Sequence, residues 1–260
     1  MKNIKKDLII ILLWPIVASL LSFAVAANVL VSTLFFFGLP AVYLSYRKRK
    51  FIKKITLFSL ISSVPIAIIA DYVMEHTGGW FLPYSVFGSF RLFGYVTLEQ
   101  IIWLFLFIYF VAIFYEVFLD RECTPKLYYP GIKYWLIILL SVFGVFLLAY
   151  IFKPTLLHIN YFYLKLGIIG AVLPLTLILF NFSGLFKKII KTGMYFSFLS
   201  LIYEITALSL GQWTFPAENQ FVGFIQILNF KFPLEEFLFW IVLGSMATVS
   251  YYEFFDEDRK

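Results

Sequence analysis

Long apolar runs constrain this chain more than any other feature of its sequence. Eight of them follow one another, at about 7–27, 29–46, 55–76, 97–118, 132–152, 160–182, 190–210 and 233–254. Each run approaches the ~20 residues that a helix needs to cross the hydrocarbon core of a bilayer. Backbone polar groups in lipid must bond within their own segment, so the runs predict helices. We therefore expect an all-α fold, a polytopic membrane protein with about eight transmembrane helices.

Composition agrees with a membrane protein and argues against an ordinary soluble domain. Of the 260 residues, 62% are hydrophobic and 14% are charged, and the mean hydropathy is +0.91. A typical soluble domain is only about 45–50% apolar. The net charge of +6 does not indicate a nucleic-acid partner, because the lysines and arginines lie in short clusters between apolar runs. We therefore expect membrane lipid to surround the apolar runs of the chain.

The basic residues also predict the orientation. If each of the eight runs crosses the membrane, the loops alternate between its two sides. The side that holds the N-terminus then carries every lysine and arginine except Arg91, Lys153, Lys165 and Lys231. Cytoplasmic loops carry the excess of Lys and Arg. Both termini are therefore expected in the cytoplasm, with the plasma (inner) membrane as the location. The lysines before the first run resemble a signal peptide, but that run is too long, and we interpret it as the first membrane helix.

The two halves of the chain carry the same residue types in the same order. Three pairs of positions lie 133 apart: Asp71 and Glu204, Trp80 and Trp213, Pro83 and Pro216. A fourth pair, Glu99 and Glu235, lies 136 apart, which a three-residue insertion explains. The sequence therefore predicts two four-helix repeats, 1–125 and 126–260. An even number of spans per half gives a parallel pseudo-repeat about an axis along the membrane normal.

Carboxyl groups beside or within the apolar runs are the candidate catalytic residues. A bare carboxylate costs roughly 2.5 kcal/mol or more near the bilayer centre. A carboxyl in an apolar pocket holds a proton and can act as a general acid, with an ionised neighbour as the base. At similar depth in the two halves, such groups could converge on one cavity. The candidates are Asp71, Glu99, Glu204, Glu235 and Glu236.

A simpler explanation exists for the carboxyls at the start of the last run. Proline followed by acids is a good helix start, because the acids meet the positive end of the helix dipole. Thr97 and Gln100 likewise fit a helix capping box. Between the two adjacent glutamates, Glu235 is favoured as the one that faces inward, because its counterpart Glu99 is retained whereas Glu236 corresponds to Gln100.

Aromatic residues cluster around these carboxyls. Their π faces attract cations, which is worth ~2 kcal/mol or more when the pair is desolvated. The competing explanation is that the tryptophans belong to the aromatic belt at the membrane interface. Proton donors and aromatic walls together suit carbocation chemistry on a hydrocarbon substrate. The candidate substrate-binding residues are Trp80, Trp103, Trp213, Phe215 and Phe237.

At these residues a family resemblance becomes specific. The second half reads Gly-Gln-Trp-Thr-Phe-Pro at 211–216 and Phe-Pro-Leu-Glu-Glu-Phe-Leu-Phe at 232–239, and the first half reads Gly-Gly-Trp-Phe-Leu-Pro at 78–83 and Leu-Glu at 98–99. This pattern resembles the lycopene cyclase domain family of integral-membrane carotenoid cyclases, in its fused tandem form. One departure is that Thr97 and Gln100 stand where the family pattern prefers proline and a second acid.

The resemblance implies an activity and a substrate. The expected reaction turns the acyclic ψ ends of lycopene into β-ionone rings, an isomerisation with no net redox change. An acid protonates C2, the C5–C6 double bond attacks the C1 cation, and C6 loses a proton. The implied partners are a lipophilic carotenoid, membrane lipid and enzymes of the carotenoid pathway.

No cofactor or metal is expected. The sequence has no Gly-x-Gly-x-x-Gly after a strand, which disfavours a flavin-dependent cyclase. The single cysteine, Cys123, and the two scattered histidines do not form a metal-binding pattern. Other functions remain open at this point: a carotenoid hydratase or another carotenoid or isoprenoid modifier, and a transporter that uses the intramembrane acids as a proton relay. A prenyltransferase is disfavoured, because Asp71 and Glu75 form a poor diphosphate–Mg²⁺ motif.

Overall fold

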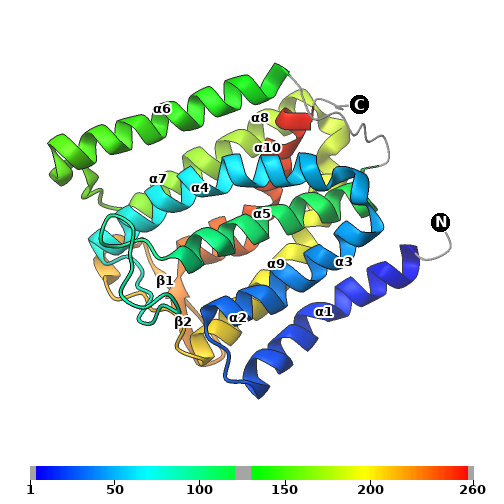
Figure 1. Cartoon of the computed structure of the whole chain (residues 1–260), viewed down its shortest axis with the longest axis horizontal. Coiled ribbons are helices and arrows are strands. Elements are labelled where there is room, and N and C mark those ends of the chain that lie inside the picture. Colours follow the sequence, from blue (N-terminus) through cyan, green and yellow to red (C-terminus); the bar gives the residue numbers. More distant parts are fainter. Residues whose placement is uncertain (1–3, 121–129, 257–260) are drawn as a thin grey trace.

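The computed structural model of the chain describes residues 4–120 and 130–256, and these residues form a helical bundle (Figure 1). The all-α prediction is confirmed, apart from one short hairpin. Helices lie in each of the eight predicted apolar runs. Cys123, the boundary between the predicted repeats at 125–126, and the basic residues at 2, 121, 126, 259 and 260 lie outside the described residues.

The helices and strands follow in chain order. They are α1 (Ile4–Ala24), α2 (Val29–Thr33), η1 (Leu34–Gly38), α3 (Leu39–Arg47), η2 (Arg49–Phe51), α4 (Ile52–Thr77), α5 (Leu98–Phe118), α6 (Pro130–Phe152), η3 (Pro154–Leu157), α7 (Phe162–Gly167), η4 (Ile168–Val172), α8 (Leu173–Asn181), η5 (Ser183–Leu185), α9 (Phe186–Ser209), η6 (Glu218–Gln220), β1 (Phe224–Ile227), β2 (Phe230–Pro233), η7 (Glu236–Val242) and α10 (Gly244–Asp256). The antiparallel strands β1 and β2 pair Phe224 with Pro233.

Within the described residues, 6 helical stretches are long and apolar enough to cross a membrane. They are Ile4–Ala24, Val29–Arg47, Arg49–Thr77, Leu98–Phe118, Lys133–Phe152 and Phe162–Asn181. The pair η7 and α10, bent by 49°, would be a seventh. Helix α9 is less apolar, because Glu204 and several Ser, Thr and Tyr residues interrupt it. The structure thus supports a membrane protein, and the number of eight spans stays a prediction.

Two of these stretches contain a π-helical turn ahead of a proline. The π segments are η1 and η4, and Pro40 and Pro174 follow each of them at the same distance. Proline has no N–H and its ring clashes with the preceding turn, so the helix widens locally. The two prolines lie 134 positions apart, close to the offset between the halves that the motifs indicate.

Ion pairs connect the ends of several helices at one end of the bundle. Arg47 at the end of α3 binds Asp7 in the first turn of α1, with 2.7 Å between Nη2 and Oδ1. Lys54 at the start of α4 binds Glu116 near the end of α5, and both side chains are buried. Removing one partner of a buried pair costs several kcal/mol. These contacts therefore fix how the ends of α1, α3, α4 and α5 lie together.

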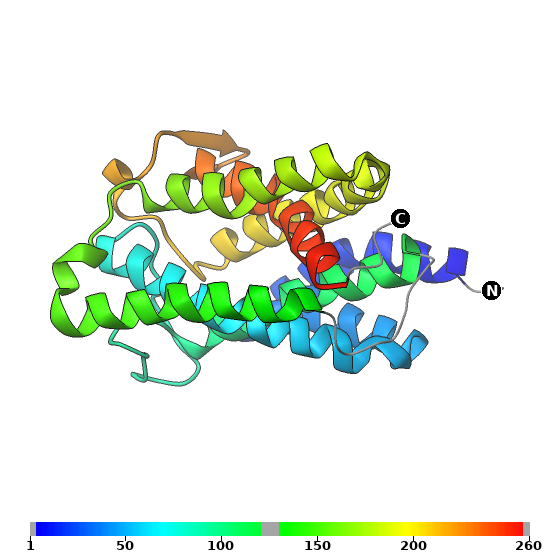
Figure 2. The same cartoon turned by 90° about the horizontal axis from the view of Figure 1, so that it is seen from above.

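Two long loops cover the opposite end. They comprise residues 78–97, between α4 and α5, and 210–235, between α9 and η7, and we call them the loop pair. Figure 2 shows the hairpin of the second loop and the first loop on opposite sides of this end. Gly78 and Gly211, with φ of 74° and 64°, end the preceding helices in the left-handed region, where glycine meets no Cβ clash.

The two loops are joined by reciprocal backbone bonds. The N–H of Phe81 donates to the carbonyl of Thr214 at 2.9 Å, and the N–H of Thr214 donates back at 3.0 Å. These residues are 133 positions apart, so the contact joins positions that the two halves share. Such self-complementary pairing is what a two-fold axis produces in a symmetric dimer.

Candidate functional site

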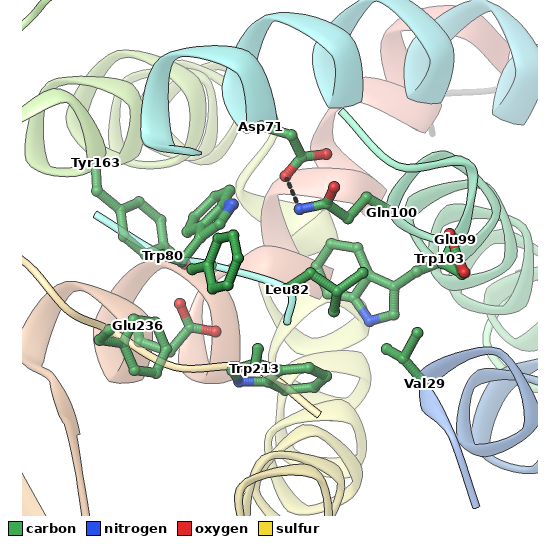
Figure 3. A pocket seen from close by; sticks show the side chains of 12 residues that line it. Val29, Asp71, Trp80, Leu82, Glu99, Gln100, Trp103, Tyr163, Trp213 and Glu236 are labelled. Atoms are coloured by element: carbon green, nitrogen blue, oxygen red, sulfur yellow. Dashed lines mark hydrogen bonds between the residues drawn. The ribbon is translucent and has the colours of Figure 1, made fainter. Parts of the chain in front are cut away.

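A cavity lies under the loop pair, between residues of both halves (Figure 3). Its volume is about 90 Å³, several times the ~10–15 Å³ that one water requires on the same measure. It is lined by Val29, Asp71, Trp80, Phe81, Leu82, Glu99, Gln100, Trp103, Tyr163, Trp213, Phe215 and Glu236. Of the candidate carboxyls, Asp71, Glu99 and Glu236 line the cavity, whereas Glu204 and Glu235 do not.

Gln100 holds the first-half carboxyl in place. Its Nε2 donates to Asp71 Oδ1 and to Glu75 Oε1, each at 3.2 Å. Its Oε1 accepts from the backbone N–H and the hydroxyl of Thr97, at 3.0 and 2.9 Å. The capping box predicted for Thr97 and Gln100 is thus confirmed, and it turns the amide nitrogen toward the carboxyls.

An ion pair extends this network toward the surface. Arg91 Nη1 lies 2.7 Å from Glu75 Oε2, and the guanidinium also donates to the carbonyls of Leu82 and Tyr95. No sequence pattern indicates this pair, because 16 residues and an irregular loop separate its members. The only sequence signal was that Glu75 lies one helical turn after Asp71, on the same face of α4.

The second-half carboxyls are arranged differently. Glu204 on α9 is fully buried, and its Oε1 accepts the indole N–H of Trp213 at 3.0 Å. Its Oε2 has no hydrogen-bond partner among the described residues. Glu236 is the ionisable neighbour of Glu204, and it faces the cavity beside Tyr163 (Figure 3). This half therefore brings two carboxyls together without an amide, whereas in the first half the amide of Gln100 donates to both carboxyls, Asp71 and Glu75.

The preference for Glu235 as the inward-facing residue is not supported. Glu236 lines the cavity, whereas Glu235 points to the loop backbone, where its Oε1 accepts the N–H of Val222 at 2.7 Å. The physical reason is that adjacent residues on a helix diverge by about 100°. The segment from Glu236 is also a π-helix, a form that often occurs at functional sites.

Glu99 makes the corresponding contact in the first half. Its Oε1 accepts the N–H of Val86 at 2.5 Å, and both of its carboxylate oxygens accept from the Ser85 hydroxyl. Glu99 borders the cavity, but in Figure 3 its carboxylate is turned away from the centre. Each of these two glutamates thus binds a backbone N–H that lies 13 residues before it.

Six of the 12 residues that line the cavity are aromatic, and four of these six were predicted. Trp80, Trp103, Trp213 and Phe215 line it, but Phe237 does not. Tyr163, which the sequence analysis missed, packs edge-on against Trp80 with 5.4 Å between ring centroids. The indole N–H groups of Trp80 and Trp103 are buried and, in the part of the chain that the structure describes, have no hydrogen-bond partner.

The site can perform acid–base chemistry in an apolar enclosure. Carboxyls on two sides of one cavity can donate and accept a proton, and the aromatic faces between them suit a cation. Within residues 4–120 and 130–256, no group of three or more His, Cys, Asp or Glu side chains could hold a metal ion. No protein-family model, curated protein or solved structure matches the chain.

Proposed function

We propose that the chain is a membrane carotenoid cyclase that converts the acyclic ψ ends of lycopene to β-ionone rings. One observation carries the proposal: Asp71 and Glu236, from opposite halves of the chain, face one cavity whose other walls are mainly aromatic. The resemblance of the motifs around Trp213 and Glu235 to membrane carotenoid cyclases suggests the substrate. The arrangement of the residues supports the type of chemistry.

The proposed mechanism needs one acid and one base. One carboxyl gives its proton to C2 of the end group, and a tertiary cation forms at C1. The C5–C6 double bond then attacks C1 and closes the ring, which moves the charge to C5. A second carboxyl removes the proton from C6, and the C5–C6 double bond returns. Atoms and electrons balance without a cofactor, and we assign the two proton transfers to Asp71 and Glu236.

The remaining predicted residues support these two. Glu204 lies beside Glu236, so a proton can be shared between the two carboxyls. The rings of Trp80, Trp103 and Trp213 line the cavity, so a cation formed inside it would meet their faces. Desolvated cation–π contacts of this kind are worth about 2 kcal/mol or more each. The aromatic walls therefore lower the energy of the charged intermediates.

We also propose the membrane arrangement that follows from the sequence. It has eight spans in two parallel four-helix pseudo-repeats, 1–125 and 126–260, with both termini in the cytoplasm and the plasma membrane as the location. The matching positions of Pro40 and Pro174, and the reciprocal bonds between Phe81 and Thr214, support the repeats. The cavity would then open near the outer leaflet, where a carotenoid end group can reach it from the lipid.

Pigment analysis tests the proposed function. The chain is expressed in a bacterial host that accumulates lycopene, next to an empty vector and to the Glu236→Gln variant. We expect a new carotenoid with β rings and with the same mass as lycopene from the host that expresses the unchanged chain, and not from the other two. Unaltered lycopene, with the protein verified in the membrane, would contradict the proposal and favour a transporter.

A carotenoid hydratase is the second candidate. The buried N–H groups of Trp80 and Trp103, which lack partners among the described residues, could hold a water molecule in the cavity. Such a water would capture the same cation. The pigment experiment separates the two enzymes, because a hydratase product is heavier by one water.

A further inference from the structure

We infer that Glu99 and Glu235 are positioning residues that hold the loop pair closed over the cavity and keep water from the cation. The consequence for the product rests on the proposed function, whereas the anchoring of the loops does not. Neither glutamate would then be the proton donor or the base. The role would explain why both halves keep an acid at this position although they differ at the next one.

The contact is the same in both halves. Each glutamate lies at the start of a helix and accepts the backbone N–H of a loop residue 13 positions earlier, Val86 at 2.5 Å and Val222 at 2.7 Å. Both glutamates are almost completely buried, at 1% and 2% exposure. A backbone N–H that loses its acceptor in an apolar surrounding is left unsatisfied, which is costly. Each of these bonds therefore ties the middle of its loop to the bundle.

The anchored loops form part of the cavity. The first loop supplies Trp80 and Leu82 to its wall, and the second supplies Trp213 and Phe215. The loops also bind each other through Phe81 and Thr214. Release of one anchor would therefore loosen both loops and open the cavity at this end.

An opened cavity changes the product in a defined way. A water oxygen would bond to the C1 cation before the C5–C6 double bond does, and the water would then lose a proton to a carboxyl. The result is a tertiary alcohol, heavier than lycopene by one water and without a ring. The acid is regenerated and no oxidant or reductant is needed.

The test compares Glu235→Ala and Glu99→Ala with Glu235→Gln and Glu99→Gln in full-length protein. Gln keeps an oxygen that can accept the loop N–H, and Ala does not. The control is Glu218→Ala, which removes an acid from the second loop that is 69% exposed and paired with Lys231 on the surface. Two quantities are measured: hydrogen exchange of peptides that contain Val86 or Val222, and the mass and rings of the pigment formed.

We expect about tenfold faster exchange in the loop of each Ala variant, a hydrated product beside the cyclic one, and rescue of both properties by Gln. The Glu218→Ala control should behave like the unchanged chain.

Unchanged exchange in the Ala variants would overturn the anchoring. Faster exchange with no hydrated product would overturn the exclusion of water. If Glu235→Gln forms no product although hydrogen exchange in its loop is unchanged, then Glu235 takes part in proton transfer, and the inference is overturned. If the unchanged chain leaves lycopene intact, the proposed function fails, while exchange still tests the anchors.

Discussion

The two halves of the site share a framework but differ in chemistry. At positions 136 apart, the first half has Gln100 and the second has Glu236. Gln100 donates to Asp71 and Glu75, and Glu75 is paired with Arg91. In the second half, Glu236 and Glu204 are neighbours, and the only hydrogen bond that the described residues give Glu204 comes from Trp213. The position that holds an amide donor beside two carboxyls in the first half thus holds a carboxyl in the second half.

This difference suggests a division of labour. A carboxyl that accepts fixed N–H bonds is held in one position and one orientation. Two adjacent carboxyls in an apolar enclosure can hold and exchange a proton. We therefore expect the second half to be the more sensitive to loss of a carboxyl, and the first half to depend more on its hydrogen-bonded support.

The largest effect is expected for Glu236→Gln. This variant keeps the shape of the side chain but removes the proton-transferring group. General acid–base catalysis contributes about 10²–10⁴-fold, so cyclisation should fall by at least about 100-fold, measured as ring formation per amount of membrane protein. An unchanged melting temperature would show that the fold is intact. Activity within a few-fold of the unchanged chain would remove Glu236 from the mechanism.

Arg91→Met should reduce the stability of the protein by breaking an ion pair that only the first half has. It leaves Glu75 buried without its cation, and a buried group that loses a charged partner costs about 1–3 kcal/mol. The free energy of unfolding, or thermal inactivation in detergent, measures the effect. Lys231→Met is the matched control, because Lys231 and Glu218 are both exposed and such pairs contribute little. Equal effects of the two variants would contradict the structural role of the Arg91 ion pair.

Gln100→Glu tests whether the halves are interchangeable. The variant removes the two donated hydrogen bonds and brings a third carboxyl beside Asp71 and Glu75, so we expect cyclisation to fall by about tenfold. The double variant Gln100→Glu with Glu236→Gln exchanges the amide and the acid between the two halves. We expect it to be as inactive as Glu236→Gln. Restored activity in the double variant would show that an acid at this position works from either half.

Much of this fold could be predicted from the sequence. Apolar runs of about 20 residues fix where helices lie in a membrane protein, because lipid leaves the backbone few alternatives. The capping box at Thr97 and Gln100 was also predictable, since it depends on residues three positions apart. The repeated order of motifs, rather than any single motif, led us to expect carboxyls of both halves at one cavity, but it favoured Glu235 where the structure has Glu236.

The rest depended on geometry that local patterns do not encode. Whether Glu235 or Glu236 faces the cavity depends on how the start of this helix is rotated against the bundle, which the local sequence does not encode. The Glu75–Arg91 pair depends on a loop in which Phe93 and Gly94 both have positive φ. The hairpin of β1 and β2 is only eight strand residues long, and its Phe- and Ile-rich sequence did not stand out in a chain that is 22% aromatic.

The smallest effect separates the two equivalent tryptophans. Trp213 donates its indole N–H to Glu204, whereas the N–H of Trp80, which lies beside Asp71, has no hydrogen-bond partner among the described residues. Trp213→Phe therefore removes a formed hydrogen bond to a carboxyl as well as part of the ring. Trp80→Phe removes part of a ring and an N–H that lies near Asp71 outside hydrogen-bond geometry. A typical intramolecular hydrogen bond contributes about 0.5–1.5 kcal/mol, and part of it remains if Glu204 finds another donor. We expect cyclisation to fall by several-fold more in Trp213→Phe than in Trp80→Phe, measured side by side. Equal losses would mean that the two indoles act only as aromatic walls, and that the contrast between the halves depends on Gln100 and Glu236 alone.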